Sequence, residues 1–199
     1  DKVTFFRAEA ERTGFQMIAL TDLAGNAVFF NAQRTTHDIS DRAYFKRALS
    51  GISTYSDVVI NRDTGLPTVT VAVPLKRNNR IIGVLFGMRD GGEISNLVRN
   101  VKLGETGYAY IGNKEGTVQG HRTNSLVINQ FNPIKAVAQD ASLMPLANLI
   151  KRGIAGERGV AQYFFAGKNI YGAFCPIENT DGWSVYVSME LDEILNGVN

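Results

Sequence analysis

The sequence predicts an α+β protein with an N-terminal helix and two tandem modules, each an antiparallel sheet flanked by helices. Three observations predict this class. Short apolar stretches are joined by turns containing Gly or Asn, which is typical of β-hairpins. Helical patterns stand before and after the groups of strands instead of alternating with them, which favours antiparallel over parallel sheets. Several features also recur about 100 residues apart, which indicates a duplicated unit.

The first part of the chain predicts a helix followed by a hairpin. Residues 1–14 mix Phe and Ala with charged residues and contain no breaker before Gly14, so we expect an amphipathic helix. Residues 15–30 contain two apolar runs around Gly25 and Asn26, which can supply the positive φ of a tight turn. The same pattern of strand, turn and strand returns in residues 107–120.

The strongest sign of duplication is a pair of longer hairpins. Residues 68–75 and 81–88 are apolar strands followed by a helical pattern, and residues 169–177 and 182–189 repeat this order. Four matches separated by 99 to 102 residues connect the two copies: Pro74 with Pro176, Gly83 with Gly182, Met88 with Met189, and Glu93 with Glu193. Single matches of this kind are common, but four in the same order indicate two copies of one module.

These patterns divide the chain into three parts. Residues 1–15 are the end of a long helix, residues 16–92 are the first module, and residues 93–199 are the second module. Further helices are expected at 41–49 and 144–152, and another at 93–101 joins the modules. Because both ends fall in helical segments and no initiating Met is present, we expect a fragment of a longer protein.

Composition excludes several classes of function. The net charge is only +2 and no basic tract interleaves with aromatic residues, so nucleic acid is not an expected partner. The single cysteine excludes a disulfide within the chain. No Gly-rich phosphate loop or catalytic triad motif is present, and the two histidines, His37 and His121, lack metal-ligand spacing. We therefore expect no enzyme activity, no cofactor and no metal.

Several motifs resemble one known family. The order of the segments 41–48, 55–59, 68–74, 104–111 and 182–195 is similar to that of double-Cache (dCache_1) sensor domains of bacterial chemoreceptors, histidine kinases and diguanylate cyclases. The resemblance implies two PAS-like modules outside the cytoplasmic membrane, in a parent chain that spans the membrane and forms a homodimer. It also implies that residues 16–92 form the membrane-distal, ligand-binding module and residues 93–199 the membrane-proximal one.

The resemblance also points to a ligand site. Arg42, followed after one residue by Tyr44 and Phe45, resembles the family's amino-acid-binding motif. A guanidinium can grip a carboxylate bidentately, and aromatic rings can exclude water and face an ammonium group. Tyr55 and Asp57 lie where the family has a second Tyr and an acidic residue, and residues two apart on a strand face the same side.

Three positions depart from the family pattern. The family usually has Trp at Tyr44, Tyr at Phe45, and an aspartate that holds the ligand's ammonium at Met88. Asp57 is then the only matched acid, unless Asp90 substitutes for the missing one. Because an unpaired ammonium is costly to bury, the expected ligand is an amino acid, an organic acid or an amine.

Each site residue also has a purely structural interpretation. Arg42 can pair with Asp38 on the surface, and Asp57 can stabilise a turn. Tyr44, Phe45 and Met88 can belong to the core. In the second module Trp183 is expected to anchor the core. The sequence does not exclude a small second pocket near His121.

The leading interpretation is a sensor that binds a small ligand without chemistry, as part of a chemotaxis receptor in the cell membrane. A histidine kinase or diguanylate cyclase is an alternative parent protein. A module that responds to a partner protein and binds no small molecule is a third interpretation.

Overall fold

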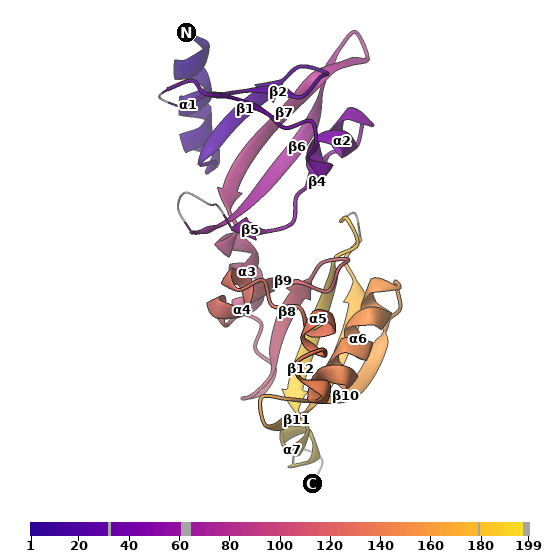
Figure 1. Ribbon diagram of the computed structural model, residues 1–199. Helices are drawn as coiled ribbons and strands as arrows, with labels where there is room; N and C mark the ends of the chain where they lie inside the picture. The colour runs from indigo at the N-terminus through magenta and orange to yellow at the C-terminus, as the bar shows by residue number, and fades with distance from the viewer. Residues whose placement is uncertain (32, 61–64, 179, 197–199) are drawn as a thin grey trace. The chain divides into compact units, whose positions relative to one another are not determined.

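The computed structural model describes residues 1–31, 33–60, 65–178 and 180–196. The chain divides into two compact units, Asp1–Gly91 and Gly92–Asn199. Each unit contains one antiparallel sheet with helices packed on it (Figure 1). The predicted α+β class, with an N-terminal helix and two antiparallel sheets, is confirmed.

The described part of the first unit, residues 1–31, 33–60 and 65–91, contains two helices and seven strands. The strand order is β3-β2-β1-β7-β6-β4, and β5 also pairs with β6. The elements are α1 (Lys2–Thr13), β1 (Met17–Thr21), β2 (Asn26–Phe29), β3 (Thr36–Asp38), α2 (Ala43–Leu49), β4 (Thr54–Tyr55), β5 (Val59–Ile60), β6 (Pro67–Arg77) and β7 (Arg80–Asp90).

Helix α1 ends where the sequence predicts. Gly14 adopts the left-handed conformation with φ 74°, and its N–H bonds back to the last turn of the helix. The helix packs on the sheet through Phe6, whose ring stacks on Phe30 with 4.3 Å between centroids. Because Phe30 follows Phe29, which faces α2, the two helices cover opposite faces of this sheet.

The predicted hairpin between β1 and β2 is confirmed. The Asp22 carboxylate accepts hydrogen bonds from the N–H groups of Ala24 and Asn26, at 2.9 and 3.0 Å, and from the Asn26 amide at 2.7 Å. Gly25 has φ 96°, and a Cβ there would lie 2.7 Å from the Ser40 backbone. A side chain is therefore excluded at this turn on two grounds.

The core of the first unit lies between the sheet and α2. Phe86 is opposite Ala19 on one neighbouring strand and opposite Ala72 on the other, so two small residues leave room for its ring. Helix α2 contributes Phe45 and Ala48, which are 2% and 0% exposed. Burial of a Phe side chain stabilises the fold by about 1.5–3 kcal/mol.

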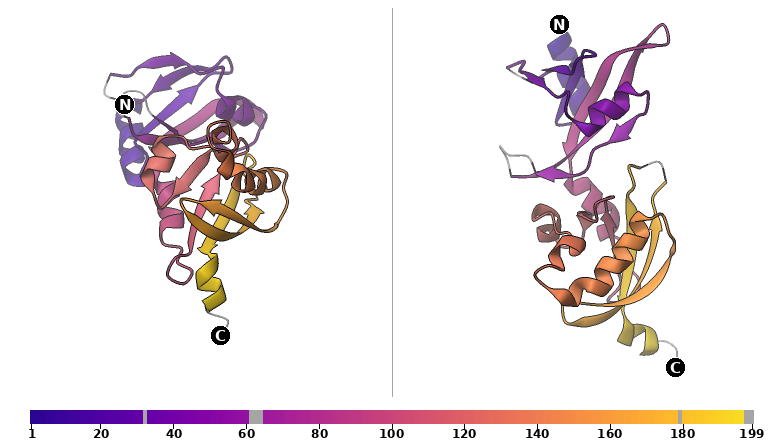
Figure 2. Two further views of the ribbon diagram at one scale, coloured as in Figure 1. Left: turned by 60° about the horizontal axis from the view of Figure 1, so that its bottom comes forward. Right: turned by 45° about the vertical axis from the view of Figure 1, so that its right-hand side comes forward.

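The second unit has strand order β10-β11-β12-β8-β9. Its elements are α3 (Gly92–Arg99), β8 (Tyr108–Gly112), β9 (Val118–His121), α4 (Asn124–Ile128), α5 (Pro133–Ala136), the 3₁₀ turn η1 (Ala141–Leu143), α6 (Met144–Ile154), β10 (Gly159–Phe165), β11 (Lys168–Pro176), β12 (Ser184–Glu190) and α7 (Leu191–Asn196). Figure 2 shows α6 lying along one face of this sheet.

Alternate residues of β8 divide this unit into two cores. Tyr108 and Tyr110 face the side covered by α6, where they pack in a cluster with Leu149 and Ile150. The intervening residues face the side of α3 and form a second cluster of Val98, Ala109, Ile111 and Trp183. Trp183 is 7% exposed, so its predicted role as a core anchor is confirmed.

The duplication is visible in the strand order. In both units the first two strands form a hairpin, and the last strand lies between the first strand and the second-to-last one. The order β2-β1-β7-β6-β4 therefore corresponds to β9-β8-β12-β11-β10. Each last strand leads directly into a helix, α3 or α7. The predicted repeat of strand, turn, strand and helix therefore describes equivalent elements.

One of the four sequence matches is wrong. Gly182 lies in the turn before β12 with φ 74°, whereas Gly83 lies inside β7 and pairs with Leu75. Gly83 is required for a different reason, because a Cβ there would lie 2.0 Å from the Thr21 carbonyl oxygen. The two positions have the same residue but different backbone conformations, and the sequence alone does not show this difference.

Candidate functional site

The first unit carries the residues that the sequence singles out. Arg42 immediately precedes α2 in an extended conformation and makes no cap hydrogen bond with its side chain. Its side chain is 62% exposed, and its Nε lies 3.6 Å from the Asp41 carboxylate. The suggested pair with Asp38 is not formed, and the Asp38 carboxylate instead accepts a hydrogen bond from the Ser40 N–H at 2.8 Å. An exposed pair of this geometry contributes little, so the guanidinium is accessible to an anion.

The two aromatic residues of the motif have different environments. Phe45 is 2% exposed and belongs to the core cluster. Tyr44 is half-buried at the margin of that cluster, with its ring centroid 5.6 Å from Phe86. Burial raises the pKa of the Tyr44 hydroxyl, which therefore stays protonated at neutral pH.

Met88 lies on the sheet face that α2 covers. It follows Phe86 by two residues on β7 and is opposite Thr70 on β6 and Met17 on β1. Met88 is half-buried, and Asp90, two residues further on, shares its face and is exposed. The fold thus brings Tyr44, Phe45, Met88 and Asp90 to the same side of the sheet.

Tyr55 is separated from this group by the strand register. It pairs with Val71, whereas its neighbour Thr54 pairs with Ala72, which faces α2. Tyr55 therefore points to the face opposite α2, and it is 58% exposed. Asp57 lies between β4 and β5 and is half-buried.

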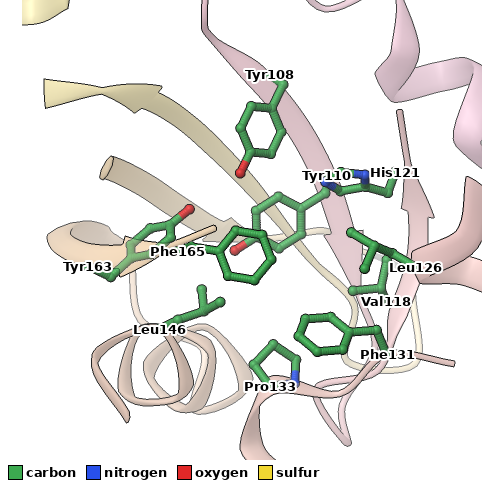
Figure 3. Close-up of a pocket in the computed structure, with 10 residues that line it drawn as sticks. All are labelled: Tyr108, Tyr110, Val118, His121, Leu126, Phe131, Pro133, Leu146, Tyr163 and Phe165. Atoms are coloured by element: carbon green, nitrogen blue, oxygen red, sulfur yellow. The ribbon is translucent and has the colours of Figure 1, made fainter. Parts of the chain in front are cut away.

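A second group of residues surrounds a small cavity in the second unit (Figure 3). The cavity has a volume of about 20 Å³. Strand β8 supplies two tyrosines, β10 supplies Tyr163 and Phe165, and β9 supplies a histidine, each pair on one strand being two residues apart. The aromatic lining residues are Tyr108, Tyr110, His121, Phe131, Tyr163 and Phe165.

The tyrosine hydroxyls in this cavity are not equally satisfied. Figure 3 shows the hydroxyls of Tyr108, Tyr110 and Tyr163 directed toward one space. The Tyr163 hydroxyl lies 2.6 Å from the Ser188 Oγ. The Tyr110 hydroxyl is buried and makes no hydrogen bond of normal geometry with the described residues, although it interacts with the nearby Tyr163 hydroxyl. Burial raises the pKa of both Tyr110 and Tyr163, so both hydroxyls remain protonated.

His121 is held in its neutral form. Its Nδ1 accepts a hydrogen bond from the Thr123 N–H at 2.8 Å, so Nε2 carries the proton of the neutral ring. Burial, together with the neighbouring Arg122, lowers the pKa of His121 to about 4. The Arg122 guanidinium stacks over the Tyr108 ring, 4.2 Å from its centroid. Nothing in the inner cavity therefore carries a charge at neutral pH.

A larger open hollow of about 390 Å³ adjoins the cavity. The two share Leu126, Phe131 and Phe165, three half-buried side chains that separate the inner space from the outer one. Asp140 lines the outer hollow, and hydrogen bonds from the Ser142 hydroxyl and N–H lower the pKa of its carboxyl. The outer hollow is therefore anionic, and the inner one is neutral.

The sequence did not exclude a pocket near His121, but it did not identify the residues that line this pocket. The signal was present, because Tyr108 and Tyr110 alternate on one strand and Tyr163 and Phe165 alternate on another. What the sequence lacks is the pairing that brings these strands into one sheet. Among the described residues, no group of three His, Cys, Asp or Glu side chains is placed to hold a metal ion. None of the described helices is both long and apolar enough to cross a bilayer.

Solved structures of sensor domains share this fold. The ligand-binding domain of Mlp24 with asparagine is 16% identical, with a TM-score of 0.66, over 99% of this chain and 77% of that one. The ligand-binding domain of the Pseudomonas fluorescens chemoreceptor CtaA with L-leucine is 19% identical, with a TM-score of 0.69, over 97% and 78% of the two chains. An extracellular domain assigned to a histidine kinase, mmHK1S-Z3, is 13% identical, with a TM-score of 0.71, over 98% and 80%.

A search of curated protein sequences found no match. In contrast, residues 3–198 match the family described as Cache domain, in its double-module form dCache_1. Cache domains are extracytoplasmic ligand-binding modules of membrane receptors. The match covers nearly the whole sequence, and the two sheets with an N-terminal helix agree with the family's architecture. This chain belongs to the double-Cache family of sensor domains.

Proposed function

We propose that this chain is the extracytoplasmic sensing part of a transmembrane chemotaxis receptor, which binds a small molecule in its first unit and performs no chemistry on it. The observation that carries the proposal is the accessible guanidinium of Arg42 beside the half-buried ring of Tyr44, in a chain of this family. An exposed cation next to an aromatic surface is suited to a carboxylate whose apolar part packs on the ring. The first unit is then the membrane-distal module and the second the membrane-proximal one.

The residues around Arg42 favour an organic acid over an α-amino acid. Met88 presents an apolar, polarisable surface on the face that α2 covers, where it offers an ammonium group no charge. An amine-bearing ligand would have to use Asp90 on the same face, or Asp57 between β4 and β5. The related chemoreceptor domains are described with asparagine, L-leucine and GABA, so both ligand types belong in a first screen.

A histidine kinase is the second candidate for the parent protein, because one of the similar structures is assigned to that class. A diguanylate cyclase fits the family equally. In each case ligand binding would shift the equilibrium of a homodimeric receptor, for which coupling energies of about 1–3 kcal/mol suffice.

The test is a thermal-shift screen with organic acids, amino acids and amines. A ligand at about 100 times its Kd stabilises the folded state by about 2.7 kcal/mol. We expect Arg42→Ala to reduce the shift given by carboxylate ligands while the unliganded melting temperature stays unchanged. The matched control is Lys46→Ala, which removes another exposed cation, four residues further along the chain in α2.

An unchanged shift in Arg42→Ala would refute the site in the first unit. A screen without any shift would favour the third interpretation, in which a partner protein and not a small molecule controls the receptor.

A further inference from the structure

We propose that the free edge of β10 pairs with β10 of a second copy of this chain, in an antiparallel arrangement with Gln162 on the two-fold axis. This strand is an edge of the sheet in the second unit, where the order is β10-β11-β12-β8-β9. The inference rests on the proposed function only for its setting, a homodimeric receptor, in which it names a contact surface. Its test uses the chain alone, so it can fail without affecting the ligand site of the first unit.

Strand β10 differs from the other sheet edges of the described chain in length and composition. It has seven residues, Gly159–Phe165, with no charged residue and no proline, and it pairs with β11 without a register shift. The other edges are shorter: β3 has three residues, β4 and β5 have two each, and β9 has four, all of them buried. Native proteins usually protect an edge with a short strand, a charge, a proline or a bulge, because open backbone groups can pair with another chain. Strand β10 has none of these protections.

The register of the sheet identifies which backbone groups face the free edge. The Ile177 N–H, just after β11, donates to the Trp183 carbonyl at 2.8 Å, so odd-numbered residues of β11 bond with β12 and even-numbered ones with β10. The even-numbered residues lie opposite Gly159, Ala161, Tyr163 and Phe165. The N–H and C=O groups of Val160, Gln162 and Phe164 therefore point away from β11. No hydrogen bond joins these groups to another described residue.

The side chains of the same three residues are open to another strand. Val160 and Phe164 are 51% and 44% exposed, and Gln162 is also exposed. Because alternate residues of a strand share a face, all three point away from the core cluster that contains Tyr163. Exposed apolar side chains beside open backbone groups are suited to strand pairing.

The order of these residues is self-complementary. In an antiparallel pair centred on Gln162, Val160 of each copy lies opposite Phe164 of the other, and all three positions exchange backbone hydrogen bonds. An axis through Ala161 or Tyr163 would leave one of the three positions without a partner in the strand. Pairs of a β-branched and an aromatic residue stabilise a sheet, and the Gln162 amide can both donate to its copy and accept from it. A second copy therefore matches the edge in its backbone and in its side chains.

One pair of strands is a small interface. We therefore expect weak association of the separate chain, with a Kd near about 1 mM. Two copies held in one receptor reach effective concentrations of about the same order, so the contact would form there. Disulfide trapping detects a weak contact, because the covalent product accumulates.

The experiment is oxidative cross-linking in a Cys175→Ser background, which removes the only cysteine of the chain. Opposite residues of a hydrogen-bonded pair have Cα atoms about 5.5 Å apart, within the range of a disulfide, so Gln162→Cys should form a covalent dimer. The matched control is Val160→Cys, because the two copies of this residue would lie about 13 Å apart, too far for a disulfide. A mixture of Val160→Cys and Phe164→Cys chains should cross-link between the variants and not within either one.

Sedimentation velocity at concentrations up to about 1 mM gives a second measurement. Gln162→Lys places two like charges opposite each other and should abolish the association. The control Ala173→Lys adds the same charge at an exposed position of the adjacent strand β11, away from the edge, and should retain the association.

Three results would overturn the proposal. Equal cross-linking of Gln162→Cys and Val160→Cys would indicate random collision. An association that Gln162→Lys leaves unchanged would assign the contact to another surface. A monomeric chain without a Gln162→Cys dimer would leave the edge to a strand of a different protein. None of these results changes the thermal-shift response that tests Arg42.

Discussion

Glu193 shows how one side chain can fix the end of a module. Its carboxylate accepts hydrogen bonds from the N–H groups of Glu105 and Thr106, at 2.8 and 2.9 Å, and another from the Thr106 hydroxyl. Gly104 lies against it, and a Cβ there would come 1.9 Å from the Glu193 Oε1. Helix α7 is therefore connected to the segment that leads into β8.

These bonds predict a pH dependence. They lower the pKa of Glu193, first through the Thr106 hydroxyl and then through the two N–H groups. A carboxyl whose pKa is lower in the folded state stabilises that state above its unfolded pKa, about 4.3, and this stabilisation is lost as the pH falls through the folded value. The melting temperature of Glu193→Gln should therefore be lower than that of the wild type at pH 7. The difference should shrink between about pH 5 and about pH 3, where the wild-type carboxyl becomes protonated.

The control for this measurement is Glu105→Gln, which removes a neighbouring exposed carboxylate but keeps the N–H that bonds to Glu193. Thermal melts at several pH values, followed by circular dichroism, give the comparison. A difference between wild type and Glu193→Gln that is constant with pH would contradict the assignment.

At the scale of elements, α2 serves two purposes with its two faces. Phe45 and Ala48 pack into the core, while Lys46 is exposed on the same helix and Arg42 is exposed just before it. The motif therefore contains one residue that builds the core and another whose exposed side chain is the proposed ligand contact. Substitutions along this helix should separate these two purposes.

Phe45→Ala should destabilise the first unit by about 3–5 kcal/mol, because it removes a large side chain from a closely packed cluster. Guanidinium unfolding, followed by circular dichroism, measures this loss. A loss below about 1 kcal/mol would be smaller than a core truncation causes and closer to the effect of a surface substitution. Such a result would show that Phe45 is not part of the core.

Much of the element pattern could be predicted from sequence, and most of the site geometry could not. The turn at Asp22 to Asn26, the end of α1 at Gly14 and the long hairpins follow from local rules that the chain obeys. The face of Tyr55 depends on the register between β4 and β6, which no local pattern specifies.

The cavity in the second unit was hidden for the same reason. Its walls come from β8, β9, β10 and the helical segments between them, so residues far apart in sequence meet only when the sheet order is known. The match between Gly83 and Gly182 was misleading for a different reason, because the two glycines have different backbone conformations.

At the scale of the whole molecule, each unit has its own core. The cluster around Phe86 draws only on the first unit, and those around Tyr186 and Trp183 draw only on the second. Trp183 is the only tryptophan, so its fluorescence reports the second unit alone.

We therefore expect Phe45→Ala to lower the unfolding midpoint seen by circular dichroism, which follows both units, more than the midpoint seen by Trp183 fluorescence. The matching substitution in the core of the second unit is Leu149→Ala, which should destabilise that unit by about 2–5 kcal/mol. It should therefore lower the unfolding midpoint seen by Trp183 fluorescence. Equal displacement of both signals by both variants would show that the two units unfold as one.

The direct passage from β12 into α7 has a mechanical consequence. Glu190 ends the strand and Leu191 begins the helix, with no connecting residue between them. Thr106 holds Glu193 of that helix and stands two residues before Tyr108, a wall of the cavity. A displacement of β8 would therefore also displace Thr106 and the hydrogen bonds that hold α7.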